Sequence, residues 1–486
     1  MKQIFNIIII LFCCLSFSIS AASKSPINAK PNIIIFFIDD MGYSDLGVFG
    51  AKNSRTPNID KLGHEGLKFT NFYSGWTACS PSRASLLTGS HAIRVGMHGS
   101  VCFPNKAKAL NPAEFTMAEM FKSAGYTTGL FGKWHLGHLP GYLPPAHGFD
   151  EYWGIPYSND MWNKRKSFYP PLPFIHNNKT VAIVDTAEDQ SLLTKVFTEK
   201  ALEFIKANHK NPFFAFIPHS AVHKPHYPLK SYLDKAKSSP LLKNYEHVKG
   251  KPNLNEVIRY AALMEELDDS VGEILSLLKE LKIDNNTVVM FLSDNGGLGM
   301  SEIHPLKGGK GGPPYEGHMR TPLVVRWPAA IPAGKVCNEI GITVDFLPTM
   351  AKWCGGKLSS NKIDGLDITE MFVNPEKAKS PHTFVPYKEL GWRKGSWKLL
   401  NFKKGNKKKG EAQQELYDLN TDIGEQNNIK AANIAKFQEL EEEQKKWLKE
   451  IIEAARPHAE MPNLRPLVSN EEEKNYPSLS KWMKEK

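Results

Sequence analysis

The chain has 486 residues, of which 41% are hydrophobic and 23% are charged, a composition typical of soluble globular proteins. Its six cysteines are too few for a disulfide-stabilised scaffold, and its length exceeds that of one ordinary hydrophobic core. The formal net charge of +10 favours an anionic substrate, whereas nucleic acid is not expected because no recognised binding motif accompanies the lysines.

The first 22 residues are predicted to be a secretory signal peptide. A basic start at Lys2 precedes an apolar run from Ile4 to Phe17, and small residues follow up to a predicted cleavage site near Ala22. The run is too short for a membrane anchor, and no later apolar stretch approaches the length of a membrane span. The sequence therefore predicts an exported protein, periplasmic or secreted, without stable membrane insertion.

Two of the six cysteines lie in this predicted signal peptide. The other four are Cys79, Cys102, Cys337 and Cys354. Cys337 and Cys354 are candidates for a disulfide bond after export, and the alternative is that both are buried thiols. Their spacing in the sequence does not decide between these two states.

Buried strands are expected to alternate with helices through most of the chain. The apolar runs 31–38 and 287–292 are typical of strands that are covered on both faces, and residues 213–217 and 323–326 are further strand candidates. Between them, residues 271–278 have apolar side chains at the spacing of a helix with one buried face. This alternation predicts an α/β sheet, whose ligands bind at the carboxyl ends of its strands.

Two polar pairs come directly after the two longest of these strands. Asp39-Asp40 follows the first strand, and Asp294-Asn295 follows the second. Their oxygen atoms suit a hard cation such as calcium or magnesium, whereas a zinc site would be richer in cysteine and histidine. Taken alone, the first pair also fits a helix cap and the second pair a turn.

The segment Cys79–Gly89 is the most informative motif of the chain. It begins Cys-Ser-Pro-Ser-Arg and resembles the signature of the sulfatase family, in which the cysteine is oxidised to formylglycine. The resemblance implies that a formylglycine-generating or sulfatase-maturing enzyme modifies Cys79, and that the hydrated aldehyde is the nucleophile. It also implies that Arg83 steadies the modified residue. The alternative for Cys79 is an unmodified buried cysteine beside a helix start, and the alternative for Arg83 is a surface ion pair.

The resemblance to sulfatases extends from about residue 31 to residue 428 and includes both polar pairs. It implies that one calcium ion polarises the sulfate oxygens and holds the modified cysteine. The ligands that it implies are Asp39, Asp40, Cys79, Asp294 and Asn295.

A second sulfatase-like signature covers residues 129–137. It implies that Lys133 binds a sulfate oxygen and that His135 forms a hydrogen bond with the formylglycine hydroxyl. Because these two residues are two positions apart, they are expected to point to the same side of a strand.

Ser158 lies in a stretch, residues 154–160, that resembles the branch containing arylsulfatase A and N-acetylgalactosamine-6-sulfatase. It is expected either to line the sulfate pocket or to lie in an Asx-like turn.

Three histidines lie in the segment that follows the predicted strand 213–217. Counted from the start of the strand, His223 falls where the family keeps a histidine that contacts the ester oxygen, so it is the candidate general acid. His226 is the competing candidate and otherwise a substrate contact, and His219 is a weaker one. Three such histidines also fit a metal cluster, but the implied calcium site is already complete without them.

Lys310 resembles the second lysine with which sulfatases bind the sulfate group. A glycine-rich loop delivers it, which allows close approach of the backbone. The chain departs from the family pattern at two places here. The link 311–314 is one residue longer than usual, and His318, a candidate substrate contact, stands where a glycine is common. The resemblance therefore does not define the shape of the substrate rim.

The last hundred residues are expected to form a second, smaller unit. Short strand-like pieces at 397–402 and 415–419 precede a helix with apolar residues between 434 and 451. The lysine-rich stretch 394–409 is typical of a solvated hairpin tip. The polar tail after Pro457 is expected to wrap the surface or to be partly disordered.

The alternation of strands and helices predicts an α/β fold, and the resemblance to sulfatases implies a large mixed sheet flanked by helices, as in alkaline-phosphatase-like enzymes. A smaller C-terminal subdomain is expected to combine an antiparallel sheet with one helix. The predicted boundaries are 1–22 for the signal peptide, 23–378 for the catalytic domain and 379–486 for the C-terminal α+β subdomain with its tail.

The resemblance implies an exported sulfatase that hydrolyses sulfate monoesters on sulfated sugars or glycan fragments. One alternative is a phosphodiesterase or phosphonate monoester hydrolase of the same superfamily. Another is a catalytically dead protein that binds sulfated glycans, but nearly every expected catalytic residue type is present. The sequence does not identify the sugar, the position of the sulfate, or endo or exo action.

Overall fold

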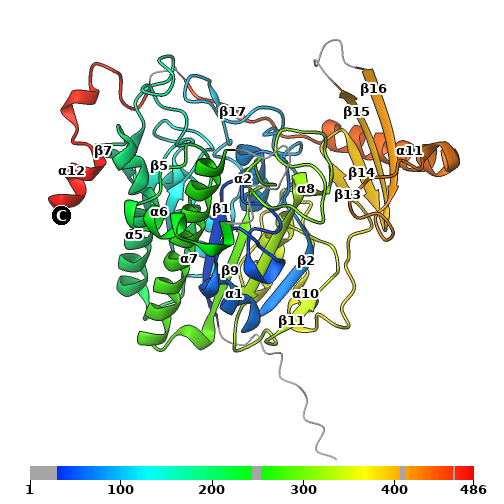
Figure 1. Cartoon of the computed structure of the whole chain (residues 1–486), viewed down its shortest axis with the longest axis horizontal. Coiled ribbons are helices and arrows are strands. Elements are labelled where there is room, and N and C mark those ends of the chain that lie inside the picture. Colours follow the sequence, from blue (N-terminus) through cyan, green and yellow to red (C-terminus); the bar gives the residue numbers. More distant parts are fainter. Residues whose placement is uncertain (1–29, 243–252, 405–410, 463–465) are drawn as a thin grey trace, which may run out of the picture.

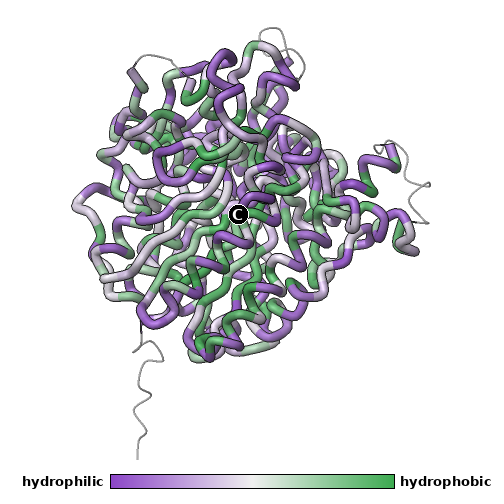
Figure 2. Tube along the Cα trace, turned by 90° about the vertical axis from the view of Figure 1, so that its left-hand side faces the viewer, coloured by the Kyte–Doolittle hydropathy of each residue, from purple (hydrophilic) through white to green (hydrophobic). Residues whose placement is uncertain are grey.

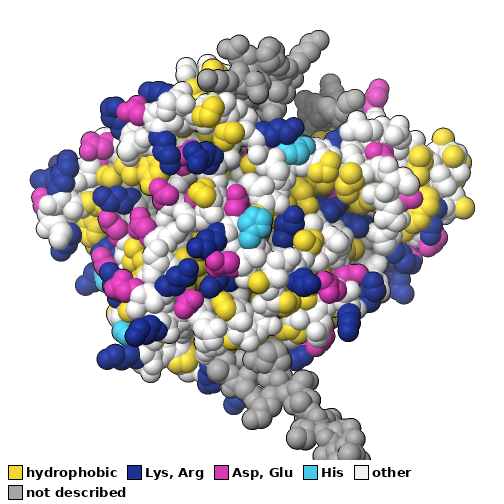
Figure 3. All heavy atoms as spheres, turned by 60° about the horizontal axis from the view of Figure 1, so that its bottom comes forward, with side chains coloured by type: hydrophobic (Ala, Val, Ile, Leu, Met, Phe, Trp, Pro, Cys, Tyr) yellow, Lys and Arg dark blue, Asp and Glu magenta, His cyan; other side chains and the backbone are white. Residues whose placement is uncertain are grey.

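The computed structural model describes residues 30–242, 253–404, 411–462 and 466–486. The predicted signal peptide, residues 1–22, lies outside the described residues. None of the helices in the described part is long and apolar enough to cross a membrane. Basic and acidic side chains are interspersed over the face shown in Figure 3, so the positive net charge does not form one basic patch on this face.

A mixed sheet of eleven strands forms the centre of the molecule (Figure 1). Its strand order is β11-β2-β10-β9-β1-β8-β4-β5-β6-β7, and β12 pairs with β2. Strands β9, β1, β8, β4 and β5 run parallel, whereas β10 is antiparallel to both β9 and β2. The strands are β1 Asn32–Ile38, β2 Leu67–Tyr73, β4 Thr127–Lys133, β5 Glu151–Ile155, β6 Pro173–His176, β7 Lys179–Ile183, β8 Phe213–Ile217, β9 Thr287–Ser293, β10 Arg320–Arg326, β11 Lys335–Cys337 and β12 Gly341–Ile342.

Helices cover both faces of this sheet, which explains the unbroken apolar run of β1. Alternate residues of the strand, such as Ile35 and Phe36, contribute to two different cores. Helices α2, α3 and α9 pack on one core and α1, α5 and α7 on the other, so the hydrophobic strands lie inside (Figure 2). The helices of this domain are α1 Pro57–His64, α2 Cys79–Thr88, α3 Met117–Ser123, α4 Ala187–Ser191, α5 Leu193–Asn208, α6 Lys230–Lys237, α7 Leu254–Glu280, α8 Glu316–Met319, α9 Phe346–Cys354 and α10 Thr369–Val373.

The predicted C-terminal subdomain is present as a four-stranded antiparallel sheet with one long helix. The strands lie in the order β13 Val385–Tyr387, β14 Gly391–Lys394, β15 Trp397–Lys404 and β16 Glu411–Asp418, and the helix is α11 Ile434–Glu453. The apolar face of α11 packs through Phe437 and Leu440 against Trp392, Leu399 and Leu416 of the sheet. The predicted domain boundary at residue 378 lies between α10 and β13.

The tail after α11 returns to the catalytic domain. Strand β17 Ala459–Glu460 pairs with β3 Lys108–Ala109, and α12 Leu479–Lys484 packs beside β7 at the far edge of the large sheet (Figure 1). Leu479 and Trp482 of α12 are buried in an apolar cluster with Phe174. The described residues of the tail therefore wrap the surface, which is the first of the two expected alternatives.

The structure corrects one expectation and answers one open question. Lys398 belongs to the lysine-rich stretch that was expected to be solvated, yet its side chain is fully buried because two carboxylates, of Glu316 and Glu425, neutralise it. Residues 405–410 of that stretch lie outside the described residues. Cys337 and Cys354 are both buried free thiols, so they do not form the candidate disulfide bond.

Candidate active site

The two polar pairs meet at the carboxyl ends of β1 and β9. The parallel register places Ile38 beside Ser293, so Asp39 and Asp294 follow at neighbouring positions. The backbone N–H of Asp294 donates to the carbonyl of Ile38 at 2.8 Å, and the N–H of Asp40 donates to Asp294 Oδ1 at 3.2 Å. All three carboxylates are completely buried. The fold thus brings the two pairs together.

Cys79 lies at the first position of α2, whose residues are all buried. Its Sγ is 3.1 Å from Asp39 Oδ1. Burial, together with the charge of Asp39, raises the pKa of this thiol well above its usual range. The unmodified thiol is therefore protonated at neutral pH and is a poor nucleophile, because the thiolate is the reactive form.

Arg83, one helical turn after Cys79, reaches the carboxylates from α2. Its Nη2 is 2.9 Å from Asp294 Oδ2, and its Nη1 donates to the carbonyl of Lys133 at 2.9 Å. Burial alone would lower the pKa of this guanidinium, but Asp294 and Asp39 outweigh burial and raise it. Arg83 is thus a permanently charged, fully buried group and does not form the surface ion pair that was its alternative role.

Two lysines complete the cationic side of the cluster. Lys133, the last residue of β4, donates to Asp39 Oδ2 and to Ser158 Oγ, the latter at 3.1 Å. Lys310 donates to Asp40 Oδ1 and lies 2.9 Å from Cys79 Sγ. Both lysines and Ser158 therefore lie where the sequence predicts them, next to Cys79 and the carboxylates.

The charges around the two aspartates set their pKa values apart. Burial raises the pKa of a carboxyl group, but Lys133 and the other cations hold the pKa of Asp39 well below its usual range. Burial and the negative charge of Asp39 raise the pKa of Asp294 to about 7. Two buried carboxylates whose oxygens lie within 4.8 Å of each other favour a bound cation between them.

The residues fit a hard metal ion. Ligand atoms of Asp39, Asp40, Cys79 and Asp294 lie within 4.8 Å of one another. Within the described residues, Asp40 Oδ2 and Asn295 Oδ1 are buried and accept no hydrogen bond, although burial of an unpaired polar atom costs free energy. Carboxylate and amide oxygens are the ligands that calcium and magnesium prefer.

His135 is in the site, but not for the reason that the sequence predicted. Strand β4 ends at Lys133, and His135 has a φ of 62°, so strand alternation does not orient it. Asp40 has a φ of 63°, and such left-handed backbone at non-glycine residues is common at active sites. Burial and the charge of Lys133 lower the pKa of His135 well below its usual range. Its neutral ring has no hydrogen-bond partner among the described residues.

The three histidines after β8 have different surroundings. His223 is mostly buried, with 13% of its side chain exposed, and has Nε2 at 3.5 Å from Asp40 Oδ2 and Nδ1 at 2.7 Å from the carbonyl of Lys224. His226 is buried, and its ring nitrogens are each 3.1 Å from a partner, Glu256 Oε2 and the carbonyl of Val222. His219 is fully buried beside Ser270. Only His223 contacts the carboxylate cluster.

The loop that carries Lys310 depends on glycine and on His318. Gly308, Gly309 and Gly311 have φ values of 89°, 151° and 86°, which side chains disfavour. The ring of His318 accepts a hydrogen bond from the N–H of Gly311 at 3.3 Å and lies 3.3 Å from the carbonyl of Pro313. His318 therefore supports the loop, and its predicted contact with substrate stays a prediction.

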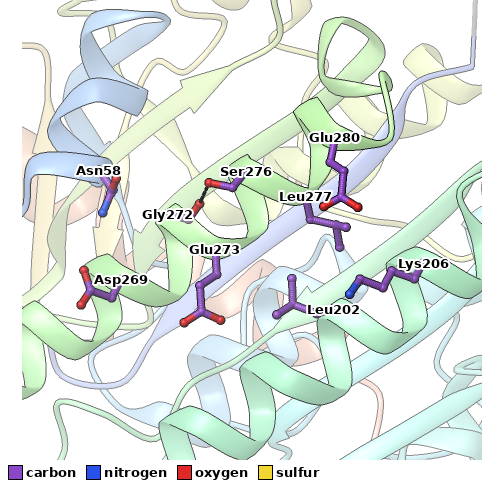
Figure 4. Close-up of a pocket in the computed structure, with 9 residues that line it drawn as sticks. All are labelled: Asn58, Leu202, Lys206, Asp269, Gly272, Glu273, Ser276, Leu277 and Glu280. Carbon is purple, nitrogen blue, oxygen red and sulfur yellow. Dashed lines mark hydrogen bonds between the residues drawn. The ribbon is translucent and has the colours of Figure 1, made fainter.

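A cavity of about 490 Å³ elsewhere on the surface contains none of these residues. It lies between α5 and α7, and Figure 4 shows that its lining is mostly acidic and small, with Asp269, Glu273 and Glu280 around Gly272. Its lining holds three carboxylates and one lysine, so it does not suit an anionic ester.

Sequence reasoning missed the support that the C-terminal subdomain gives to this site. Lys398 is bound to Glu316, the first residue of α8, which follows the loop of Lys310. The sequence signal was a lysine inside an apolar strand, Trp397 to Leu400, where a charged side chain needs a buried partner.

Two family models match the chain. The model described as Sulfatase covers residues 31–356, more than half of the chain, and the model described as N-sulphoglucosamine sulphohydrolase, C-terminal, covers residues 314–454. Over 370 residues the chain is 37% identical to N-acetylgalactosamine-6-sulfatase of Rattus norvegicus, which corresponds to 70% of this chain and 65% of the rat protein. It is 31% identical to arylsulfatase A of Homo sapiens over 391 residues, 76% of this chain and 73% of that protein. The chain thus spans slightly less than two thirds of the rat relative.

Solved structures with the same fold include carbohydrate-bound ones. Ps i-CgsB in complex with k-i-k-neocarrahexaose has a TM-score of 0.73 and 28% identity, and covers 88% of this chain and 95% of that chain. PsFucS1 sulfatase from Pseudoalteromonas sp. has a TM-score of 0.74 and 26% identity, with coverages of 88% and 91%. Phosphonate monoester hydrolase of Agrobacterium radiobacter, at 18% identity and a TM-score of 0.61, shares the fold.

Proposed function

We propose that this chain, which belongs to the sulfatase family of sulfuric ester hydrolases, hydrolyses sulfate monoesters on sulfated carbohydrates. The observation that carries the proposal is the convergence of three buried or nearly buried cations, Arg83, Lys133 and Lys310, on Cys79 and the carboxylates. A sulfate group has three oxygens free of the ester bond, and such cations stabilise the charge that develops on them during hydrolysis.

Two groups are needed to complete this site, and its residues fit both. Cys79 stands at the start of a buried helix in the motif that sulfatase maturation enzymes modify, and formylglycine at this position supplies a hydroxyl nucleophile. Asp39, Asp40, Asp294 and Asn295, together with the modified residue, would hold calcium, which would supply positive charge to the site. The unpaired oxygens of Asp40 and Asn295 support this assignment.

The side chains of the chain itself position and stabilise the ester. Lys133, fixed by Asp39 and Ser158, and Lys310, fixed by Asp40, each have donors to offer to a sulfate oxygen. Arg83 lies against Asp294 and favours the ionised form of that carboxylate and of Asp39. His135 has no partner among the described residues and is neutral, so it is able to bond with the hydroxyl at position 79.

His223 is the residue that donates a proton to the leaving alcohol. Its position at the open side of the cluster, with Nε2 at 3.5 Å from Asp40, allows contact with a bound ester oxygen. The carbonyl of Lys224 holds the other ring nitrogen at 2.7 Å and fixes the orientation of the ring. His226 lacks a free nitrogen because both have partners within the protein.

The proposed substrate class rests on the relatives. The names of the similar proteins include an N-acetylgalactosamine-6-sulfatase and a structure in complex with a neocarrahexaose.

We also propose that the protein is exported, periplasmic or secreted, because residues 1–22 have the pattern of a signal peptide. A formylglycine-generating or sulfatase-maturing enzyme is then a partner that acts before export.

The alternative reaction is hydrolysis of a phosphodiester or phosphonate monoester. Co-expression with a maturation enzyme, followed by assays of an aryl sulfate, a sulfated disaccharide and an aryl phosphodiester, separates the two. We expect turnover of the sulfate esters to exceed that of the phosphodiester by orders of magnitude. The reverse ranking would overturn the proposed function, and an absence of all three activities would favour the dead glycan-binding protein.

A further inference from the structure

A cavity of about 480 Å³ lies directly beside His223. Three parts of the chain form it: the segment from Lys224 to Tyr227, the start of α7 with Glu256 and Arg259, and the loop after β5 with Arg165. A volume of this size is typical of small-molecule sites. The cavity is separate from the carboxylate cluster, and neither the proposed mechanism nor the sulfatase motifs assign it a role.

The cavity has an excess of positive charge. Its lining includes the cations Arg165, Lys224 and Arg259 but only one carboxylate, that of Glu256. In the described part of the chain, Arg165 and Lys224 have no acidic partner within ion-pair distance, whereas the exposed Lys230 is paired with Asp234. The guanidinium of Arg259 donates only to the carbonyl of His226 at 3.4 Å.

The single carboxylate is already engaged. Glu256 Oε2 lies 3.1 Å from Nδ1 of His226, whose other ring nitrogen faces the carbonyl of Val222. Burial lowers the pKa of His226, so the imidazole is neutral at pH 7 and adds no positive charge. The two unpaired cations at the mouth, Arg165 and Lys224, are therefore available to an anionic ligand.

The cavity is connected to the catalytic cluster through one peptide unit. His223 is 3.5 Å from Asp40 on one side and is bonded on the other side to the carbonyl of Lys224, whose side chain lines the cavity. The cavity is therefore the next space beside a saccharide whose ester oxygen contacts His223.

We propose that this cavity is a subsite for a second anionic group, a sulfate or a carboxylate, on the same saccharide substrate. The inference rests on the proposed function, which it deepens by naming a charge requirement in the substrate. Arginine and lysine are the side chains that bind sulfate and carboxylate groups through charge-assisted hydrogen bonds. Arg165 and Lys224 are the specificity-determining residues of this subsite, and Arg259 lies deeper and adds charge.

The first test compares two disaccharides that carry the same scissile sulfate ester, of which only one has a second sulfate. We expect the wild-type ratio of kcat/KM, disulfated over monosulfated, to exceed one. In Lys224→Ala and in Arg165→Ala we expect this ratio to fall about tenfold, as a lost charge-assisted hydrogen bond implies. Lys230→Ala, an exposed lysine outside the cavity, is the matched control, and its ratio should equal that of the wild type.

The second test does not depend on turnover. Titration calorimetry of the disulfated disaccharide into Cys79→Ala protein measures binding directly, with and without Lys224→Ala. We expect the dissociation constant to rise about tenfold in the double variant. An unchanged dissociation constant would overturn the subsite. An equal fall in kcat/KM for both disaccharides in the kinetic test would also overturn it. If wild-type protein hydrolyses neither disaccharide but binding still depends on Lys224, the proposed function fails and the subsite stands.

Discussion

Lys398 of the C-terminal sheet and Glu316 of α8 form a fully buried ion pair, with Nζ at 3.0 Å from Oε1. Glu425 contributes a second carboxylate to the same lysine at 2.9 Å. The residue after Glu316 donates its N–H to the carbonyl of Lys307, at 2.9 Å, within the loop that delivers Lys310. The small sheet is thus bonded, through Glu316, to a loop of the active site.

We predict that Lys398→Met lowers the free energy of unfolding by about 3–5 kcal/mol, because it leaves the buried Glu425 without its cation and Glu316 with only Arg393 and Arg320. The matched control is Lys394→Met, which removes an exposed ion pair with Glu443 and should cost about 1 kcal/mol or less. Denaturant unfolding measures both. Equal effects of the two substitutions would contradict a structural role for the buried pair.

The same cluster predicts how stability depends on pH. Burial by itself raises the pKa of Glu316, but Lys398, Arg393 and Arg320 outweigh burial and hold it well below its usual range. A carboxyl group with a lowered pKa in the folded state stabilises the protein fully above its unfolded pKa of about 4.3, and this stabilisation is lost as the pH falls further.

We therefore expect the melting temperature to fall steeply below about pH 4. Glu316→Gln should show a weaker dependence in that range, because the group that titrates is gone. A series of thermal melts from pH 6 to pH 3 measures this. Parallel curves for the wild type and Glu316→Gln would show that other carboxylates cause the acid sensitivity.

Maturation of Cys79 is the next prediction. Because α2 is fully buried, the motif is accessible to a modifying enzyme only before the domain folds. Mass spectrometry of active protein should show the aldehyde in place of the thiol at position 79. Cys79→Ala should lose several orders of magnitude in kcat, since it removes the nucleophile. Full activity of protein that carries only unmodified Cys79 would refute the mechanism.

Removal of metal should abolish activity and lower stability together. A chelator is expected to stop turnover, calcium to restore it, and zinc not to restore it. Calcium at a hundred times its dissociation constant should stabilise the protein by about 2.7 kcal/mol, which a shift in melting temperature reports. Asp294→Ala should lose both effects. Turnover that survives chelation with no metal found in the protein would contradict the site.

The last prediction separates His223 from His226. If His223 is the general acid, His223→Ala should slow poor leaving groups, such as sugar alcohols, far more than an activated aryl sulfate. His226→Ala should instead mainly raise KM for the sugar, because it releases Glu256 beside the basic cavity. Should the leaving-group dependence follow His226, the two roles must be exchanged.

Much of the catalytic half follows from local sequence signals. Apolar runs that end in acidic pairs predicted β1, β9 and the meeting of Asp39 with Asp294, because parallel strands in register bring their ends together. Cys79, Lys133 and Lys310 were predicted from the resemblance to sulfatases, and the structure places Lys133 at the end of β4 and Lys310 at 2.9 Å from Cys79 Sγ.

The sequence did not reveal features that depend on residues far away along the chain. Nothing local to Lys398 shows that Glu316 and Glu425 neutralise it, so a lysine-rich stretch predicted solvent exposure. The position of His135 depends on a left-handed backbone that strand periodicity does not encode. The unpaired charge of Arg165 and Lys224 appears only once three separate segments form one cavity.

The return of the tail to the large sheet matters while the protein is being synthesised. Ser478 forms a bridge with Ile183, and Trp482 packs against Phe174, so the edge strands β6 and β7 obtain their cover from residues translated much later. Until those residues leave the ribosome, that edge exposes apolar surface and unpaired backbone groups, and such nascent edges are prone to aggregation. A chaperone that shields β6 and β7 during synthesis would therefore raise the yield of the protein, and deletion of residues 466–486 would make that need permanent.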